Sequence, residues 1–418
     1  MKKANLTITL AAAMALVPGT LAYSAATAAT TNPQSMTATY AKGQYGFDLQ
    51  LLQQHLKPVE LKNGDACVLI APEYQGRVMT SSASGMTGFS YGWINRDLIA
   101  SGKVGPHINA YGGEERLWFG PEGGQFSIFF AKDATFDLAH WQTPACIDTE
   151  PFLTDTANAT SAVFSKKVKL TNYSGFAFEV AVTRKVTLLS RADIVAKLAI
   201  ALPDDVRMVA YETDNRLTNT GNQPWVKETG ALSIWLLGMM NPSPDATVVI
   251  PYRPGGLGPI VKDDYFGKVP ADRLKVSEDG VFFKADGKLR SKIGIPPKRA
   301  LPVFGSYDAS NKVLTVVETA IDSSATDYVN SAWEIQKEPF AGDVINSYND
   351  GPQADGSQMG PFYELESSSK AGFLKPGETL SHLQRTFHFE GDEAALSLIA
   401  VRKLGVSLEH IKAAFGNK

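Results

Sequence analysis

The sequence predicts an all-β protein: one large antiparallel β-sandwich with short helices at its two ends. From Cys67 onward, short apolar or alternating runs are separated by glycine, proline and asparagine, which is the pattern of strands joined by turns. No βαβ alternation occurs, so a doubly wound parallel sheet is disfavoured. No repeat period or low-complexity linker divides the chain, which favours one domain over a string of modules.

The first 28 residues have the pattern of a secretory signal peptide. Two lysines precede an apolar run from Leu10 to Val17, and Ala26-Thr27-Ala28 offers a cleavage site. Residues 29–45 then form a polar linker. We therefore expect a periplasmic or secreted protein.

The remaining chain, residues 46–418, is expected to be a single domain. Apolar side chains at helical spacing predict a helix at residues 47–56 and two more near the end. Strands are predicted in the stretches 163–172, 176–189, 208–221, 226–238, 247–253, 280–288, 313–322 and 361–369, and the C-terminal helices at 392–404 and 407–415. A two-domain alternative would place the joint in the Pro/Gly-rich segment 251–270.

Composition excludes several classes of protein. The 40 basic and 43 acidic residues are interspersed and give a net charge of −3, so nucleic acid is not an expected partner. No later apolar run approaches the roughly 20 residues that a membrane span needs. The six histidines lack metal-ligand spacing, so we expect no metal. The two cysteines, Cys67 and Cys146, could pair in an oxidising compartment if they come close.

A glycine-rich stretch, "AYGGEERLWFGPEGGQFSIFF" at residues 110–130, is the first candidate for a site. Arg116 offers a fork of donors, Trp118 a flat apolar face, and Glu122 and Gln125 acceptors and donors, which together suit a sugar. No helix follows the glycines, so the stretch is not a phosphate loop, and we expect no cofactor. The alternative is a hairpin in which Arg116 pairs with Glu114 or Glu122 and Trp118 lies in the core.

Two carboxylates, Glu364 and Glu366, are the second candidate. They stand at i and i+2 of a predicted strand and would share one face. Ionised carboxylates are costly to bury, so the pair is either solvated on an edge strand or held by partners at a site.

The C-terminal part resembles the end of aldose 1-epimerases. Leu365-Glu366, a loop, and Leu374-Lys375-Pro376-Gly377-Glu378 fill the positions of the family's pattern. The glutamate of the Leu-Glu pair is the family's catalytic base, which removes the proton of the anomeric hydroxyl. The resemblance therefore implies that Glu366 is a base.

The N-terminal half resembles the same fold. "VLIAPEYQGRVMTS" is similar to the opening hairpin of galactose mutarotase-like proteins, which makes Arg77 structural, and "NAYGGEERLW" is similar to the family's Leu-His-Gly-Gly segment. Tyr111 stands where the family has its first substrate-binding histidine. The stretch 214–238 resembles the strand pair that supplies the family's second histidine but contains no histidine, so the acid could be His107, Tyr111 or Glu122.

A fuller resemblance is to an uncharacterised bacterial family of the galactose mutarotase-like superfamily, which implies a large supersandwich of β-strands. It rests on "GGEERLWFGPEGGQFSIFF", "KIGIPPKRALPVFGSYD", "WEIQKEPFAGDVINSYNDGP" and "GPFYELESSS". Lys292, Trp333 and Asn349 fall in these segments and are expected in the pocket with Glu364.

The leading hypothesis is an exported protein that acts on or next to the anomeric centre of a mono- or oligosaccharide. Glu366 would be the base, with His107, Tyr111 or Glu122 as the acid. One alternative is a carbohydrate-binding protein without turnover. Another is a polysaccharide lyase, in which Arg116 and Lys292 would neutralise a uronate.

Overall fold

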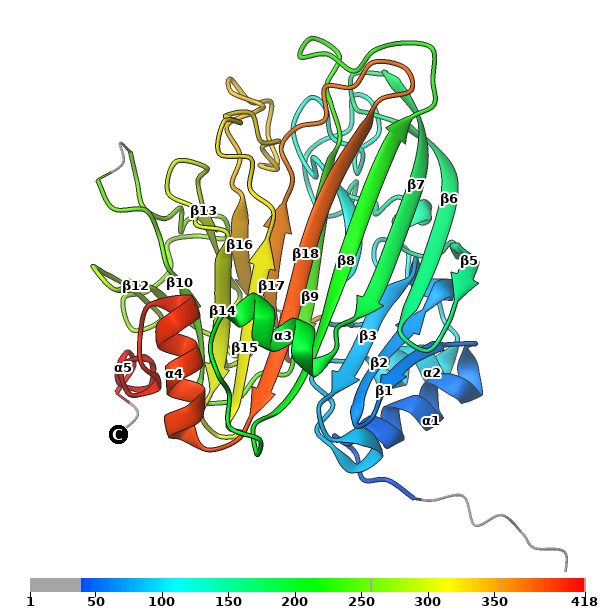
Figure 1. Ribbon diagram of the computed structural model, residues 1–418. Coiled ribbons are helices and arrows are strands. Elements are labelled where there is room, and N and C mark those ends of the chain that lie inside the picture. Colours follow the sequence, from blue (N-terminus) through cyan, green and yellow to red (C-terminus); the bar gives the residue numbers. More distant parts are fainter. Residues whose placement is uncertain (1–38, 256–257, 354, 417–418) are drawn as a thin grey trace, which may run out of the picture. The chain divides into compact units, whose positions relative to one another are not determined.

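The computed structural model describes residues 39–255, 258–353 and 355–416. The expected signal peptide and residues 29–38 of the expected linker lie outside the described residues. Within these residues the strands form three sheets, of ten, five and three strands, in which all neighbouring strands are antiparallel (Figure 1). Residues 40–418 form one compact unit.

The ten-stranded sheet is built around long alternating strands. In β7, for example, Val180 and Val182 are buried, and the residue between them is only partly buried. The strand order is β11(Leu274–Ser277), β12(Gly280–Lys284), β10(Ala246–Ile250), β14(Val303–Asp308), β15(Val313–Thr319), β18(Thr379–Glu390), β8(Arg207–Asn219), β7(Ala177–Leu188), β6(Ser161–Thr171) and β5(Leu153–Ala157).

The five-stranded sheet packs one face against the ten-stranded sheet. A shared core joins Leu117 and Ile234 of the smaller sheet to Val180 and Leu217 of the larger one. The strand order is β13(Ser291–Ile295), β16(Ile345–Asn349), β17(Tyr363–Ser368), β9(Ser233–Met240) and β4(Arg116–Gly120). The predicted antiparallel β-sandwich is therefore confirmed.

The three-stranded sheet is β1(Val59–Asn63), β2(Ala66–Ala71) and β3(Arg77–Ser82), and it packs with two helices near the start of the described chain. These are α1(Tyr45–His55) and α2(Arg96–Ser101). The predicted helix at residues 47–56 corresponds to α1. Its apolar face, with Leu49 and Leu52, packs on Leu69 and Met79 of the strands.

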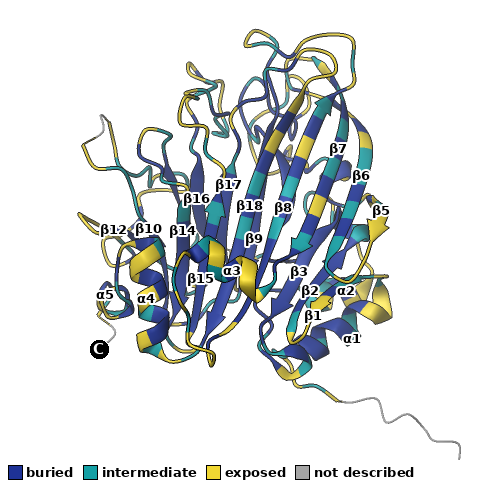
Figure 2. Ribbon diagram, viewed as in Figure 1, coloured by how far each residue is buried: buried dark blue, intermediate teal, exposed yellow. Residues whose placement is uncertain are grey.

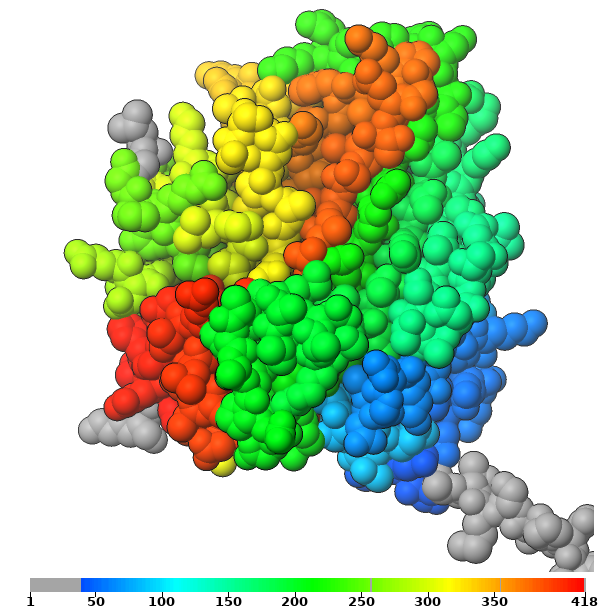
Figure 3. All heavy atoms as spheres, in the orientation of Figure 1, coloured from blue at the N-terminus to red at the C-terminus, as the bar shows by residue number. Residues whose placement is uncertain are grey.

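Three helices cover part of the outer face of the ten-stranded sheet: α3(Arg191–Leu198), α4(Glu393–Leu404) and α5(Leu408–Ala413). Figure 2 shows buried residues where α4 meets the sheet, and in Figure 3 the C-terminal helices (red) lie beside the α3 segment (green). The expectation that helices occur only at the ends was wrong for α3. A capping box of Ser190 and Asp193 starts this helix, and Ile194 and Leu198 anchor it.

The two cysteines are free and buried in different clusters. Cys67 lies under α1, whereas Cys146 lies in the core of the sandwich. Burial raises the pKa of the Cys67 thiol to about 11 and that of Cys146 to about 12. Among the described residues, no helix is long and apolar enough to cross a membrane, and no group of three His, Cys, Asp or Glu side chains is arranged to hold a metal ion.

Candidate functional site

A cavity of about 950 Å³ lies over the face of the five-stranded sheet that points away from the core. Alternate residues of each strand face it, because side chains in a strand alternate between the two faces. In the register of β4 and β9, Trp118 lies opposite Trp235, and Gly120 lies opposite Ser233. Loops complete the walls, and the charged or aromatic lining residues are His107, Arg116, Trp118, Glu122, Trp141, Trp235, Lys262, Asp264, Tyr265, Phe266, Arg290, Lys292, Trp333, Glu334, Asp343, Tyr348, Asp350 and Glu364.

Glu364 and Glu366 stand on β17, the middle strand of this sheet. Both carboxylates are therefore on one face, as their spacing predicts, but the strand is central and the solvated-edge alternative is wrong. Glu366 is fully buried beneath the lining residues Lys292 and Trp235. The Lys292 ammonium and the Trp235 indole each donate to its Oε2 at 2.9 Å. Its Oε1 is buried and has no hydrogen-bond partner in the described part of the chain.

Glu364 pairs with Arg116, whose Nη2 lies 2.5 Å from Oε1. The guanidinium also stacks on Trp118, 4.6 Å from the ring centroid. Burial raises the pKa of Glu364 to about 7, the Arg116 charge opposes this rise, and Glu366 adds to it. Arg116 thus bridges strands β4 and β17 across β9, and the alternative in which it pairs with Glu114 or Glu122 is wrong.

Glu122 is a third carboxyl group of the cavity. Burial raises the pKa of Glu122 to about 7, the positive charge of Lys292 opposes this rise, and the charge of Glu366 adds to it. Burial alone would lower the pKa of Lys292, but Glu366, Glu122 and Glu364 together raise it. One lysine therefore faces three carboxyl groups, and burial raises the pKa of two of them, Glu122 and Glu364, to about 7.

The glycine pair after Glu122 allows two loops to meet. A Cβ on Gly123 would overlap the carbonyl oxygen of Ala332, so only glycine fits at this approach. The loops are fastened by hydrogen bonds that Gln125 exchanges with the Gln336 backbone, at 2.9 and 3.0 Å. The result is a wall that places Glu122 beside Trp333.

Tryptophans form one end of the cavity. Trp118 meets Trp235 edge-on with 5.7 Å between ring centroids, and Trp141 stacks with Trp333 at 5.8 Å. The indole nitrogens of Trp118 and Trp141 and the Ser233 hydroxyl are buried without a hydrogen-bond partner among the described residues. This surface combines flat apolar faces with unpaired polar atoms, which suits the C–H faces and hydroxyls of a sugar.

The expected site residues divide into two groups. His107, Arg116, Trp118, Glu122, Lys292, Trp333 and Glu364 line the cavity, and Glu366 lies directly beneath it. The Nδ1 atom of His107 lies 2.8 Å from the carbonyl oxygen of Trp141, which fixes the ring in the wall.

Three expected residues do not line the cavity. Tyr111 stacks on Tyr74 at 3.9 Å between the centroids, in the cluster under α1. Gln125 fastens the loop wall, and Asn349 is fully buried, where it accepts from the Gly287 backbone and donates to Leu289. Backbone groups thus use the polar atoms of the Gln125 and Asn349 side chains, whereas Tyr111 is held by ring stacking.

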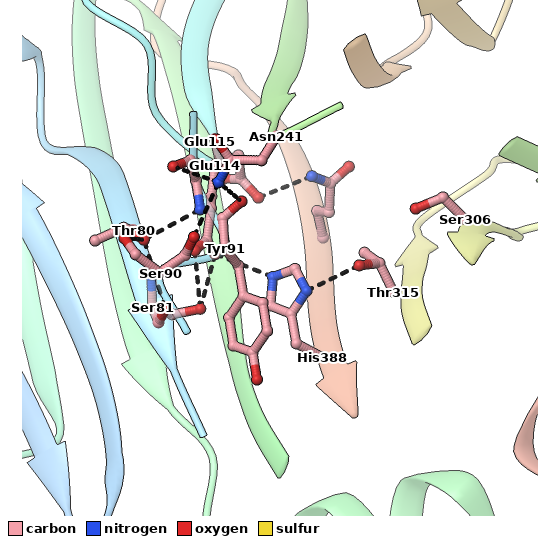
Figure 4. A network of polar contacts seen from close by, with 12 residues as sticks. Thr80, Ser81, Ser90, Tyr91, Glu114, Glu115, Asn241, Ser306, Thr315 and His388 are labelled. Atoms are coloured by element: carbon pink, nitrogen blue, oxygen red, sulfur yellow. Dashed lines mark hydrogen bonds and ion pairs between the residues drawn. The ribbon is translucent and has the colours of Figure 1, made fainter. Parts of the chain in front are cut away.

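The two acids of "GGEERLW" lie outside the cavity, in a buried polar network (Figure 4). Glu114 contacts Ser81 and, at 3.1 Å, the Nε2 atom of His388. Glu115 forms a fully buried ion pair with Arg184 at 2.9 Å. The Gly-Gly-Glu-Glu segment thus fastens three sheets together, while Arg116 and Trp118 turn to the cavity.

The sequence did not single out Lys262, Tyr265, Asp343 or Tyr348 as site residues. The Tyr265 hydroxyl donates to Asp343, and the Lys262 ammonium lies 4.5 Å from the Tyr265 ring centroid. Lys262 and Tyr265 come from the Pro/Gly-rich segment 251–270 that could have been a domain joint, whereas Asp343 precedes β16 and Tyr348 lies in it. The density of aromatic and charged residues in segment 251–270 was the available signal.

Fold and site together define an antiparallel β-sandwich protein with a carboxylate- and tryptophan-lined cavity. The chain belongs to a family of unknown function, DUF6786, whose model matches residues 43–415. This agrees with the expected membership in an uncharacterised family. No curated protein matches the chain.

Solved structures similar to this chain include galactose mutarotase-like proteins. The Slr1438 protein of Synechocystis is 11% identical and has a TM-score of 0.48, with 80% of this chain and 96% of that chain covered. A galactose mutarotase related enzyme of Lactobacillus acidophilus is 10% identical, with a TM-score of 0.45 and coverage of 80% and 98%. A galactose mutarotase-like protein of Lactobacillus casei is 10% identical, with a TM-score of 0.44 and coverage of 80% and 100%. Likenesses of this size define neither a substrate nor a reaction.

Proposed function

We propose that this is an exported carbohydrate-active protein that acts on or next to the anomeric centre of a sugar by carboxylate acid/base chemistry. The observation that carries the proposal is the cluster of three carboxyl groups around one lysine, beside a tryptophan surface. Enzymes that move two protons at a sugar ring commonly use a pair of carboxyl groups, of which one is protonated and acts as the acid and the other is ionised and acts as the base.

Glu366 is the base in this proposal. Its Oε2 is fixed by Lys292 and Trp235, which each donate to it at 2.9 Å. Its Oε1 has no partner in the described residues and is the acceptor for a hydroxyl proton. Substrate would reach this oxygen between the Lys292 and Trp235 side chains.

Glu122 is the acid, because it lines the cavity and its raised pKa of about 7 leaves it about half protonated at neutral pH. In the reaction Glu366 removes the proton of the anomeric hydroxyl, and Glu122 protonates the ring oxygen as the C1–O5 bond breaks. The open-chain aldehyde then closes on its other face, and both protons return. No atom is gained or lost, so the reaction interconverts anomers.

The test is anomer exchange, measured by NMR with the mature protein and a panel of reducing sugars. Glu366→Gln should lower the rate at least 100-fold. Glu338→Gln, at an exposed glutamate outside the cavity lining, is the matched control and should leave the rate unchanged. If the wild type shows no anomer exchange but binds a glycan, and Trp118→Ala abolishes this binding, the protein is instead a binding protein. Full activity in Glu366→Gln would refute the assignment of the base.

The ion pairing of the cavity's cations gives less support to the alternative of a polysaccharide lyase. Arg116 and Lys292, the cations it requires, are already paired with Glu364 and Glu366. An unsaturated product that absorbs in the ultraviolet would nevertheless identify that reaction.

A further inference from the structure

Two positively charged side chains of the cavity differ from Arg116 and Lys292 in their ion pairing. Lys262 and Arg290 line it, and neither forms an ion pair with a carboxylate among the residues that the structure describes. Both side chains are only partly buried. A partly desolvated cation that is not held in an ion pair can bind an anionic group of a ligand.

Both cations are held in place by one loop, residues 262–266. The Lys262 backbone exchanges two hydrogen bonds of 2.8 Å with Gly294, at the edge of the five-stranded sheet. The Lys262 ammonium lies over the Tyr265 ring, and the Arg290 guanidinium lies 4.0 Å from the Phe266 ring centroid. A cation on an aromatic face keeps its N–H groups available at the edge.

The Arg290 side chain is fixed from a second side. Its Nε donates to the Tyr348 hydroxyl at 3.3 Å, which leaves the two terminal nitrogens of the guanidinium. These are the pair that binds a carboxylate or sulfate with two parallel hydrogen bonds.

The nearby acids are already engaged. Asp343 accepts from the Tyr265 hydroxyl, and Asp350 accepts from the Tyr348 hydroxyl at 2.6 Å and from the Gly360 amide at 3.1 Å. Burial is the main cause that raises the pKa of both groups. Asp264 is exposed on the loop, where water screens its charge.

We propose that the substrate is an acidic glycan, whose carboxylate or sulfate group is bound by Arg290 and Lys262. This inference rests on the proposed function of the cavity as a sugar site and specifies the class of sugar. The acidic group lies at the end of the cavity formed by the loop, while the tryptophan end takes an apolar sugar face. The size of about 950 Å³ is at the upper end for ligand pockets and allows more than one sugar unit.

The experiment measures equilibrium binding of three length-matched trisaccharides to the mature protein: galacturonate, O-sulfated galactose and neutral galactose. We expect at least one acidic trisaccharide to bind ten-fold or more tightly than the neutral one at low ionic strength, and the preference to fall with added salt. The carboxylated and sulfated ligands show which anion is preferred.

The variants assign the effect to the two cations. Lys262→Met with Arg290→Met should reduce the preference to less than about two-fold, whereas Lys288→Met, an exposed lysine outside the cavity lining, should retain it. If the double variant does not fold, the same binding measurement is made with the two single variants. Equal binding of acidic and neutral ligands, binding of none of the three, or a preference that survives in the folded variants would overturn the proposal.

The failure of each proposal has its own signature. A preference for acidic over neutral trisaccharides without any anomer exchange would contradict only the proposed reaction. Exchange of neutral sugars without acidic preference would contradict the acidic substrate alone.

Discussion

Replacing Glu122 by glutamine should make the protein more stable at alkaline pH than the wild type. The ordinary pKa of this carboxyl is 4.5, and burial, aided by the charge of Glu366 and opposed by that of Lys292, raises it to about 7 in the folded protein. The folded state therefore binds the proton more tightly than the unfolded chain. The stability from this group is fully present below about pH 4.5 and is lost as the pH rises through about 7.

The difference between pKa values of 4.5 and about 7 corresponds to about 3 kcal/mol. Because the side chain keeps some contact with solvent at the cavity wall, about 1–2 kcal/mol is the realistic gain. Glutamine does not titrate, so the free energy of unfolding of the variant, minus that of the wild type, should grow by this amount between pH 4 and pH 8.5.

The assay is urea unfolding followed by tryptophan fluorescence at several pH values, with Glu338→Gln as the control for loss of an exposed carboxyl. A difference that stays constant with pH, or equals that of the control, would refute the assigned environment of Glu122. If Glu122 is also the acid, kcat/KM of the wild type should fall as the pH rises above about 7.

Three further predictions concern the scaffold. Arg184→Met leaves the Glu115 carboxylate buried and unpaired, so urea unfolding should show a loss of about 3–5 kcal/mol, and a loss under about 1 kcal/mol would contradict the buried pair. Gly123→Ala forces the two loops of the wall apart and should cost about 1–3 kcal/mol, seen as a lower Tm; an unchanged Tm would disprove the close approach. Both cysteines should resist alkylation in the native protein and react after unfolding, because burial disfavours their thiolates, whereas a disulfide in the purified protein would disprove their free state.

Several features of the site could be predicted from sequence because they depend on local geometry. Strand alternation places Glu364 and Glu366 on one face whatever the rest of the fold does. The same rule sends Arg116 and Trp118 to one face of β4 and the residue between them to the core. The start of helix α3 could also be predicted from the sequence, because its capping box of Ser190 and Asp193 is a local signal.

Other features depend on which strands become neighbours. Lys292 reaches Glu366 across 74 residues of sequence, and Arg116 reaches Glu364 across 248. The position of Tyr111 likewise depends on a ring partner, Tyr74, which lies in a short 3-10 helix between β2 and β3.

The sequence by itself determined the all-β class and the placement of Glu364 and Glu366 on one face of a strand. It also determined the presence of side chains that suit a sugar. Only the tertiary structure decided that β17 is central, which carboxyl groups face Lys292, and that Lys262 and Arg290 form no ion pair among the described residues. The reason is physical: side-chain alternation follows from the backbone of one strand, whereas strand order and register are set by long-range packing of the sheets.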